Sequence, residues 1–199
     1  MTRELQHRTN NLLAVIQSVA GQSLSGAQSL DQAREAFTAR LHALAHANAL
    51  LTQSDWKGAS LKEVIARELA SFVSRATIEG PRVVLNLNAT QGFALIIHEL
   101  ATNAAKHGAL STPAGKVAIH WSVDGKGDTP SFSFSWQERG GPRVASPTRK
   151  GFGSTLLKSA IGGVDASPNI EFTPKGVHYT LEAPLSAVAV ATGDTTPEQ

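Results

Sequence analysis

The spacing of apolar residues changes part-way along this chain, and that change constrains the fold more than any other feature. Up to about residue 56, apolar side chains recur every three or four positions, as on amphipathic helices. Beyond residue 80, short segments alternate apolar and polar side chains and are rich in β-branched residues, as strands are. We therefore expect an α+β chain, with a helical hairpin over residues 1–56 and a domain with a mixed sheet over residues 57–185.

The N-terminal segment predicts two amphipathic helices joined by a Ser- and Gly-containing loop over residues 23–29. Asp31 is expected to cap the second helix. The short connection makes the pair antiparallel, and a second copy that completes a four-helix bundle, hence a homodimer, would cover its apolar sides. Those sides consist of Leu5, Leu12, Leu13, Ile16, Val19, Ala20 and Leu24 in the first helix and of Phe37, Leu41, Leu44 and Leu51 in the second, with Asn48 on the same seam.

The rest of the chain predicts a mixture of helices and strands. Ser60 is expected to cap a helix that ends near Val73, and a strong helix covers Phe93–His107. Residues 186–199, rich in Ala, Thr and Pro, are expected to form a disordered tail. Strands are expected at Val83–Leu87, Lys116–Val123, Ser131–Gln137, Ile170–Phe172 and Val177–Ala183, and a short helix after Gly153.

Charge and composition exclude several classes of function. The chain has 199 residues and a formal net charge of +2, and its scattered basic residues form no stripe for a nucleic-acid groove. It has no Cys, which excludes disulfides, thiolate zinc sites and Cys nucleophiles and fits a cytoplasmic protein. The longest apolar runs, at 12–16 and 93–97, are too short to span a membrane. No segment is typical of a signal sensor, so we expect an upstream sensor outside this chain.

One histidine is placed for phosphoryl chemistry. On a wheel at about 100° per residue, His7 lies opposite the apolar side of the first helix, with Arg8 beside it and Asn11 one turn further on. An imidazole in water is about 75% neutral at pH 7, and the neutral form is a nucleophile that suits attack on a γ-phosphorus. A surface histidine without a chemical role is the alternative, and it is our interpretation of His42 and His46.

A polar stripe runs along the helix predicted at Phe93–His107. Glu99, Asn103 and Lys106 stand at positions i, i+4 and i+7, on one face. An amide oxygen suits Mg²⁺, a carboxylate can hold a water of that ion, and an ammonium group neutralises phosphate charge. A solvated helix face is the alternative. The opposite face is apolar and suits packing on a sheet: Phe93, Ile97, Leu100 and Ala104.

Two glycine-bearing segments follow. Residues 136–142 end a strand, and residues 151–155 open a helix, where backbone N–H groups favour phosphate. Their spacings match neither a Walker loop nor a dinucleotide fingerprint. Trp56, Trp121 and Trp136 are expected to be packing residues.

Taken together, these segments resemble the HWE group of bacterial sensor histidine kinases. The resemblance is carried by His98 in the segment His98-Glu-Leu-Ala-Thr-Asn103, by Trp136-Gln-Glu138, and by Gly-Phe-Gly-Ser at 151–154. The N-terminal His7-Arg-x-x-Asn11 is similar to the subgroup associated with alphaproteobacterial general stress signalling. The matches stand in family order and extend to about residue 185.

This resemblance implies an ATP-binding α/β sandwich of the GHKL type, with ATP and Mg²⁺ as cofactors. His7 would be the phosphoacceptor, Asn103 would ligate Mg²⁺, and Glu99 would assist through a water. Asn11 would position water for the phosphatase reaction, Glu138 would stand where other histidine kinases place the adenine-reading Asp, and His98 would be structural. The other expected nucleotide-binding residues are Lys106, His107, Gly140, Gly141, Gly151, Phe152, Gly153, Ser154 and Thr155.

The expected activity is autophosphorylation of His7 by ATP, followed by transfer to an Asp of a response-regulator receiver domain. Two alternatives remain open. One is a phosphotransfer or binding module with a degenerate nucleotide site, and the other is a GHKL Ser/Thr kinase or ATPase that acts on a separate partner.

Overall fold

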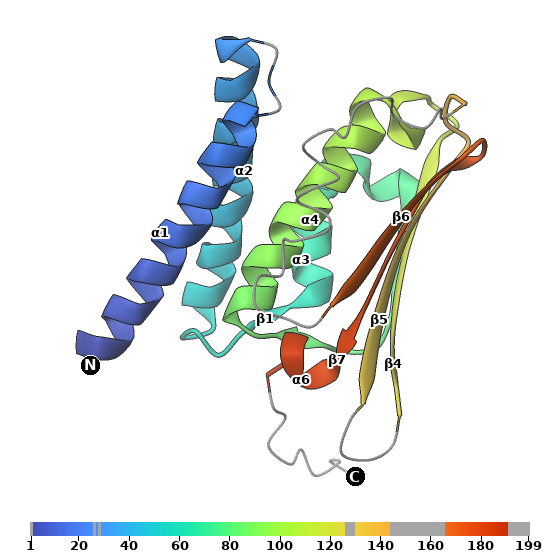
Figure 1. Cartoon of the computed structure of the whole chain (residues 1–199). Helices are drawn as coiled ribbons and strands as arrows, with labels where there is room; N and C mark the ends of the chain where they lie inside the picture. The colour runs from blue at the N-terminus through green and yellow to red at the C-terminus, as the bar shows by residue number, and fades with distance from the viewer. Residues whose placement is uncertain (1, 26, 28, 126–129, 144–165, 191–199) are drawn as a thin grey trace.

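The computed structural model describes residues 2–25, 27, 29–125, 130–143 and 166–190, and it confirms the α+β class. A hairpin of two long helices lies on one side of the molecule, a helical layer lies in the middle, and a twisted sheet lies on the other side (Figure 1). The middle layer contains α3 (Leu61–Glu68) and α4 (Leu87–Lys106), and α4 lies between the hairpin and the sheet.

The hairpin consists of α1 (Thr2–Ser25) and α2 (Leu30–Gln53). Ser29, not Asp31, is the N-cap of α2, because its side chain accepts a hydrogen bond from the Gln32 backbone N–H at 3.2 Å. The cap predicted at Asp31 is therefore wrong. Asp31 lies in the first turn instead, where its negative charge complements the helix dipole.

The main sheet is mixed, as expected. Its strand order is β2-β4-β5-β7-β6, in which β2 pairs parallel with β4 and every other pair is antiparallel. The strands predicted at 116–123, 131–137, 170–172 and 177–183 are confirmed and slightly longer, whereas β2 was not predicted. The strands are β2 (Ala76–Glu79), β4 (Lys116–Asp124), β5 (Ser131–Arg139), β6 (Ser167–Thr173) and β7 (Gly176–Pro184).

Two predicted boundaries are wrong near the start of α4. The strand predicted at Val83–Leu87 is the two-residue β3 (Val84–Leu85), which pairs with β1 (Ala59–Ser60). It ends there because the Asn86 side chain accepts from the Ala89 N–H at 2.9 Å and starts α4 at Leu87, well before Phe93.

The helix predicted to end near Val73 also needs correction. It ends at Glu68, and a 3₁₀ segment follows over Ala70–Arg75. Ser60 occupies its N-cap position without a side-chain capping bond.

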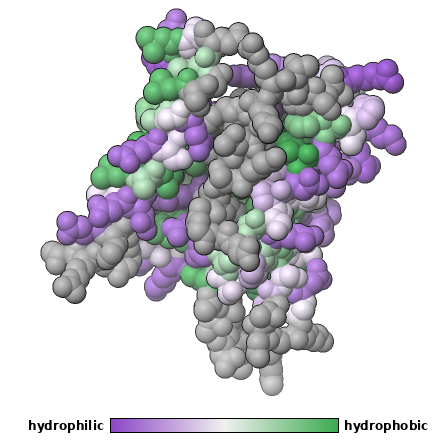
Figure 2. All heavy atoms as spheres, in the orientation of Figure 1, coloured by the Kyte–Doolittle hydropathy of each residue, from purple (hydrophilic) through white to green (hydrophobic). Residues whose placement is uncertain are grey.

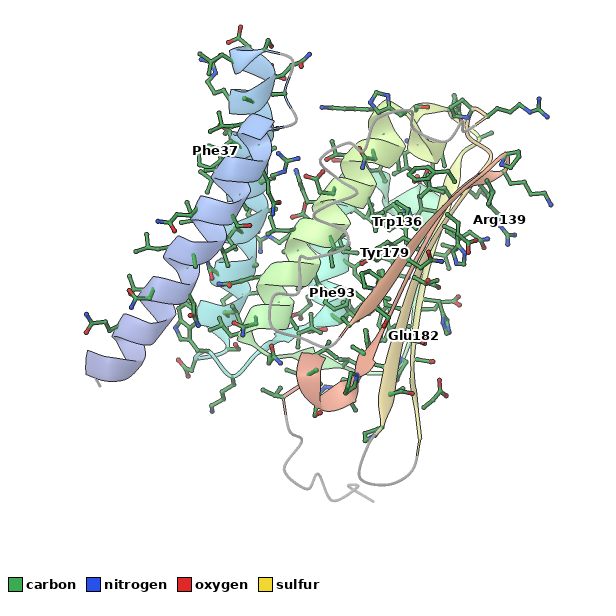
Figure 3. All side chains as sticks on the ribbon, viewed as in Figure 1. Phe37, Phe93, Trp136, Arg139, Tyr179 and Glu182 are labelled. Carbon is green, nitrogen blue, oxygen red and sulfur yellow. The ribbon has the colours of Figure 1, made fainter. Side chains whose placement is uncertain are left out.

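Aromatic residues fill the space between α4 and the sheet (Figure 3). The Phe93 ring of α4 meets the rings of Phe132 and Phe134 edge-on, with centroid distances of 5.9 and 5.3 Å. Trp121 and Trp136 are fully buried, which confirms them as packing residues. Trp56 is less buried than these two, because it is 37% exposed and stands at a positive φ of 62° in the turn after α2.

The hairpin shares its core with the middle helical layer and the sheet, because α2 packs along α4. Ala47 and Leu51 belong to the same buried cluster as Phe93. From the sequence, we expected a second copy to cover the apolar side of α2. At Ala47 and Leu51, this side is instead covered within the chain. On α1, Leu13 and Leu24 are 51% and 64% exposed, and Figure 2 shows apolar side chains gathered over the hairpin.

The segment after β7 is ordered further than predicted. Residues Leu185–Val188 form the short helix α6, Val188 is buried, and its carbonyl accepts from the Asn86 N–H at 2.9 Å. The tail predicted from residue 186 is thus wrong for residues 186–190, and 191–199 lie outside the described part. Among the described helices, none has the length and apolar character that crossing a bilayer requires.

Candidate functional site

The candidate site is built on α4, a helix with two different faces. Phe93, Ile97, Leu100 and Ala104 are all buried, as the predicted apolar face requires. The polar stripe of Glu99, Asn103 and Lys106 lies on the other face. The helix therefore anchors on the sheet and presents polar groups away from it.

The C-terminal part of this stripe is open. The side chains of Asn103, Lys106 and His107 are all exposed. The helix ends there because the N–H groups of His107 and Gly108 both donate to the Asn103 carbonyl, at 2.8 and 3.0 Å. An amide oxygen, an ammonium group and an imidazole are thus presented together by the last turn.

A buried carboxylate lies directly beneath this last turn. Glu138, near the end of β5, is only 3% exposed. Its Oε2 accepts from the Ala109 N–H at 2.7 Å, and its Oε1 accepts from Trp136 Nε1–H at 3.3 Å. Burial raises the pKa of Glu138 above its ordinary value of 4.5, and these two hydrogen bonds lower it by less.

Glycines allow this close packing. A Cβ on Gly108 would lie 2.1 Å from Glu138 Oε2, and one on Gly141 would lie 2.7 Å from the Ala109 Cα. Gly140 has a positive φ of 75°, which favours glycine. Of the two predicted site residues here, Gly141 is therefore close to the end of α4, and Gly140 lies against the segment Ala114 and Gly115 that follows.

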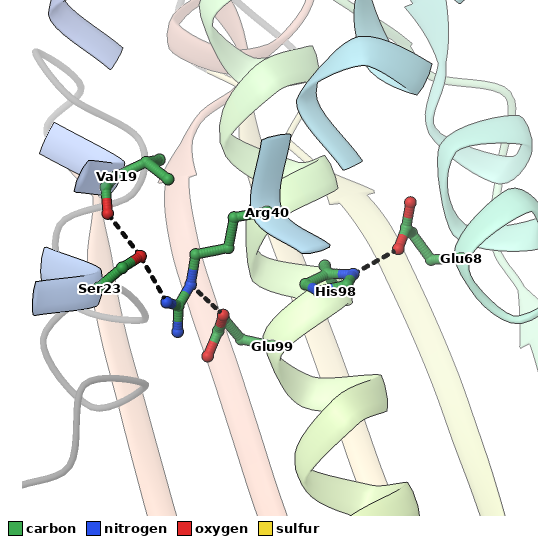
Figure 4. Close-up of polar contacts among 6 residues, drawn as sticks. All are labelled: Val19, Ser23, Arg40, Glu68, His98 and Glu99. Carbon is green, nitrogen blue, oxygen red and sulfur yellow. Dashed lines mark hydrogen bonds and ion pairs between the residues drawn. The ribbon is translucent and has the colours of Figure 1, made fainter. Parts of the chain in front are cut away.

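Glu99 is not part of this open region. It is 7% exposed, and its Oε1 accepts from Arg40 Nε of the hairpin at 2.7 Å (Figure 4). Arg40 Nη1 also donates to Ser23 Oγ at 2.8 Å, and the Ser23 hydroxyl donates to the Val19 carbonyl at 2.7 Å. The predicted stripe is thus divided: Glu99 faces the hairpin, whereas Asn103 is exposed.

Arg40 is a residue that sequence reasoning missed. It stands 59 positions before Glu99, so no local pattern connects the two. A charged residue on the apolar seam of the second helix was the available signal.

His98 also contacts a neighbouring helix. Its Nδ1 lies 2.9 Å from Glu68 Oε2 on α3, and His46 Nδ1 of α2 lies 3.8 Å from Glu68 Oε1. The first contact agrees with the structural role expected for His98. His42 and His46 are exposed, as expected.

The remaining predicted residues are only partly described. The backbone of His7 lies in the second turn of α1, and Asn11 is exposed one turn later. The side chain of His7 and the whole segment Gly151, Phe152, Gly153, Ser154 and Thr155 lie outside the described residues. Within the described ranges, His, Cys, Asp and Glu side chains form no group of three or more that could hold a metal ion.

Comparison with known proteins assigns this arrangement to a family. Residues 4–82 match the model of the family described as HWE histidine kinase. The blue-light-activated histidine kinase of Brucella anthropi is 39% identical over 192 residues, which is 94% of this chain and 39% of that protein. The chain belongs to the HWE histidine kinase family.

A second relative supports the assignment of this chain to the HWE family. The blue-light-activated histidine kinase of Brucella ovis is 35% identical over 206 residues, covering 100% of this chain and 42% of that protein. The chain thus spans about two fifths of the length of these relatives.

Solved structures resemble this HWE family member in fold. The Erythrobacter litoralis EL346 blue-light activated histidine kinase superimposes with a TM-score of 0.63 at 16% identity, over 92% of this chain and 58% of the other. A histidine kinase domain from the same protein gives a TM-score of 0.53 at 17% identity, over 89% and 95%. The shared fold is therefore a helical hairpin followed by helices packed on a mixed sheet.

Proposed function

We propose that this chain is the phosphotransfer core of a cytoplasmic, ATP-dependent protein histidine kinase. It phosphorylates His7 and passes the phosphoryl group to an Asp of a response-regulator receiver domain. One observation carries the proposal: in an HWE family member, the exposed Asn103 and Lys106 stand on the last turn of α4, directly above the buried Glu138 carboxylate.

The geometry around Glu138 supports a role in holding the adenine ring. Each of its oxygens accepts one N–H from the protein, and a carboxylate oxygen has a further lone pair for a second donor. The amino group of adenine is the donor we propose. Gly140 and Gly141 would border the base, and Gly151–Thr155 would form the lid on the phosphate side.

The last turn of α4 supports binding of the phosphates. The exposed ammonium group of Lys106 would neutralise phosphate charge, with His107 next to it. The exposed amide oxygen of Asn103 fits Mg²⁺, which usually takes few protein ligands beside nucleotide phosphates. Glu99 would hold a water of that ion once its carboxylate is free. When bound, Mg²⁺ supplies neutralisation of the charge on the triphosphate.

The proposed reaction has two steps. A ring nitrogen of neutral His7 attacks the γ-phosphorus, an N–P bond forms, the bond to the β–γ bridging oxygen breaks, and ADP leaves while the ring proton passes to solvent. An Asp carboxylate of the receiver domain then attacks the phosphorus, the N–P bond breaks, and the imidazole takes a proton back from solvent. Asn103, Lys106 and Glu138 act by positioning and by charge, which is what phosphoryl transfer requires. Asn11 would orient water for hydrolysis.

Labelling with γ-³²P-ATP tests the proposal. We expect an acid-labile, base-stable phosphoprotein, which His7→Ala abolishes and Asn103→Ala greatly weakens. His42→Ala is the matched control, because His42 is an exposed histidine of the other hairpin helix and should label normally. Persistent labelling of His7→Ala would refute the phosphoacceptor assignment. Acid-stable label would favour a Ser/Thr kinase, and absence of Mg²⁺-dependent nucleotide binding would favour a degenerate module.

The exposed apolar residues of the hairpin support a homodimer. Leu13, Leu24 and Leu30 are 51%, 64% and 80% exposed, and a second copy would cover them. Sedimentation equilibrium of the chain and of Leu13→Glu tests this: the substitution should shift a dimer towards monomer.

A further inference from the structure

A buried ion pair joins the hairpin to the catalytic domain at Glu99. The side chains of Arg40 and Glu99 are 7% and 9% exposed, and their closest atoms, Nε and Oε1, are 2.7 Å apart. Ser23 of α1 extends the contact, because it accepts from Arg40 (Figure 4). All three long helices therefore contribute to this ion pair, α1 through the contact of Ser23 with Arg40.

The ion pair is one end of a seam between α2 and α4. Asn48 lies eight positions after Arg40 on α2, and its Oδ1 accepts from Gln91 Nε2 at 3.0 Å. Gln91 lies eight positions before Glu99, so the two helices run antiparallel with one polar contact at each end. Eight residues of helix span about 12 Å. The seam thus specifies one docked position of the hairpin.

A buried ion pair suits a contact that must open. Both ions regain water when the helices separate, so the pair specifies the docked arrangement more than it stabilises it. While it persists, however, Arg40 occupies one acceptor site of Glu99 Oε1 and holds the carboxylate against α2. The guanidinium charge beside it also repels a divalent cation.

The placement of His7 agrees with a docked state that does not transfer phosphate. Figure 1 shows the N-terminal end of α1 and the C-terminal end of α4 at opposite ends of the molecule. About 18 residues of helix, or roughly 27 Å, separate His7 from the end of α1 near which α4 ends. Transfer within one chain requires the hairpin to leave this position.

We infer that Arg40 is a positioning residue that acts through Glu99, as a latch between hairpin and catalytic domain. With the hairpin docked, it holds the Glu99 carboxylate against α2 and away from Asn103. Release of α2 from α4 frees Glu99 and completes the nucleotide site. This inference rests on the proposed histidine kinase function, in which Glu99 serves the Mg·ATP complex.

Arg40→Gln tests the latch, because it removes the charge and keeps most of the length. We expect its initial rate of autophosphorylation at saturating Mg·ATP to rise several-fold, with ADP affinity in the absence of Mg²⁺ changed less than twofold. Arg40→Lys, which keeps the charge, should stay near the wild-type rate. The matched control is Arg34→Gln, an exposed arginine of the same helix that pairs with Asp31 at 3.4 Å and should behave as wild type. An unchanged or lower rate for a folded Arg40→Gln protein overturns the inference.

A reversible cross-link tests the docked state without touching the ion pair. The chain has no Cys, so Asn48→Cys with Gln91→Cys introduces the only two thiols. Bridging them with a short bis-methanethiosulfonate should lower autophosphorylation at least tenfold, and reduction should restore it. Full activity of the bridged protein refutes the latch. Absence of acid-labile label in the unmodified wild type would instead refute the proposed function itself, and the inference with it.

Discussion

Replacing Gly108 by alanine should uncouple the end of α4 from β5. The new Cβ would lie 2.1 Å from Glu138 Oε2 and 2.9 Å from the Ala104 Cα. The backbone itself accepts alanine, because φ of Gly108 is −109°. The cost is therefore steric and is concentrated on the Glu138 carboxylate, which must move by about 1 Å and lose its 2.7 Å hydrogen bond from the Ala109 N–H.

The magnitude follows from the two contacts. Loss of a hydrogen bond to a charged group costs about 1.5–3 kcal/mol, and overpacking against Ala104 costs about 1–3 kcal/mol. A Gly→Ala change at a permitted φ returns about 0.4–1 kcal/mol through the unfolded state. We expect Gly108→Ala to lower the free energy of unfolding by about 2–5 kcal/mol.

A double-mutant cycle in urea isolates the contact. Unfolding can be followed by fluorescence of the buried Trp121 and Trp136 and checked against circular dichroism. In a Glu138→Ala background the carboxylate clash is absent, so Gly108→Ala should cost only about 1 kcal/mol. A coupling of about 1.5–3 kcal/mol is expected. Additivity within about 0.5 kcal/mol would refute the contact between Gly108 and Glu138.

Two further predictions concern burial. Glu138→Gln should change the pH dependence of stability. Burial raises the folded-state pKa of Glu138 above 4.5. The contribution of Glu138 to the free energy of unfolding is therefore largest below pH 4.5 and is lost as pH rises through the folded-state pKa. The difference in unfolding free energy between Glu138→Gln and wild type should therefore increase with pH above 4.5, by at most about 1.4 kcal/mol per pH unit. A pH-independent difference would contradict the burial argument. Leu51→Ala should cost about 2–5 kcal/mol in urea unfolding, because Leu51 is fully buried in the core that α2 shares with α4. Leu13 on α1 is half exposed, so Leu13→Ala should cost less than about 1 kcal/mol. Equal costs would place Leu51 outside that core.

The amino-acid sequence predicts what depends on local periodicity. The alternation in β4, β5 and β7 indicates strands because successive side chains point to opposite faces of a sheet. The spacing of Phe93, Ile97 and Leu100 predicts the buried face of α4 for the equivalent reason in a helix. β2 escaped prediction because its residues 76–79 form a short edge strand in which only partly buried and exposed residues alternate.

In the candidate site, too, some features could be predicted from the sequence and others could not. The sequence predicted the polar stripe on α4 from residue type and spacing, which are local properties, whereas Glu138 was predicted only from the resemblance to the HWE group. That Glu138 accepts the Ala109 N–H follows from how β5 passes beneath the end of α4. Its second donor, Trp136, is a local contact, because it stands two positions earlier on the same strand.

Only the tertiary structure decided which groups the stripe faces. The sequence determined that Glu99 and Asn103 share one face of a helix. It did not determine that α2 covers Glu99 and leaves Asn103 open, or that Arg40 supplies the partner charge. Contacts between residues 59 positions apart are set by the packing of whole helices, where the cost of burying a charge is met by a partner that no local pattern specifies.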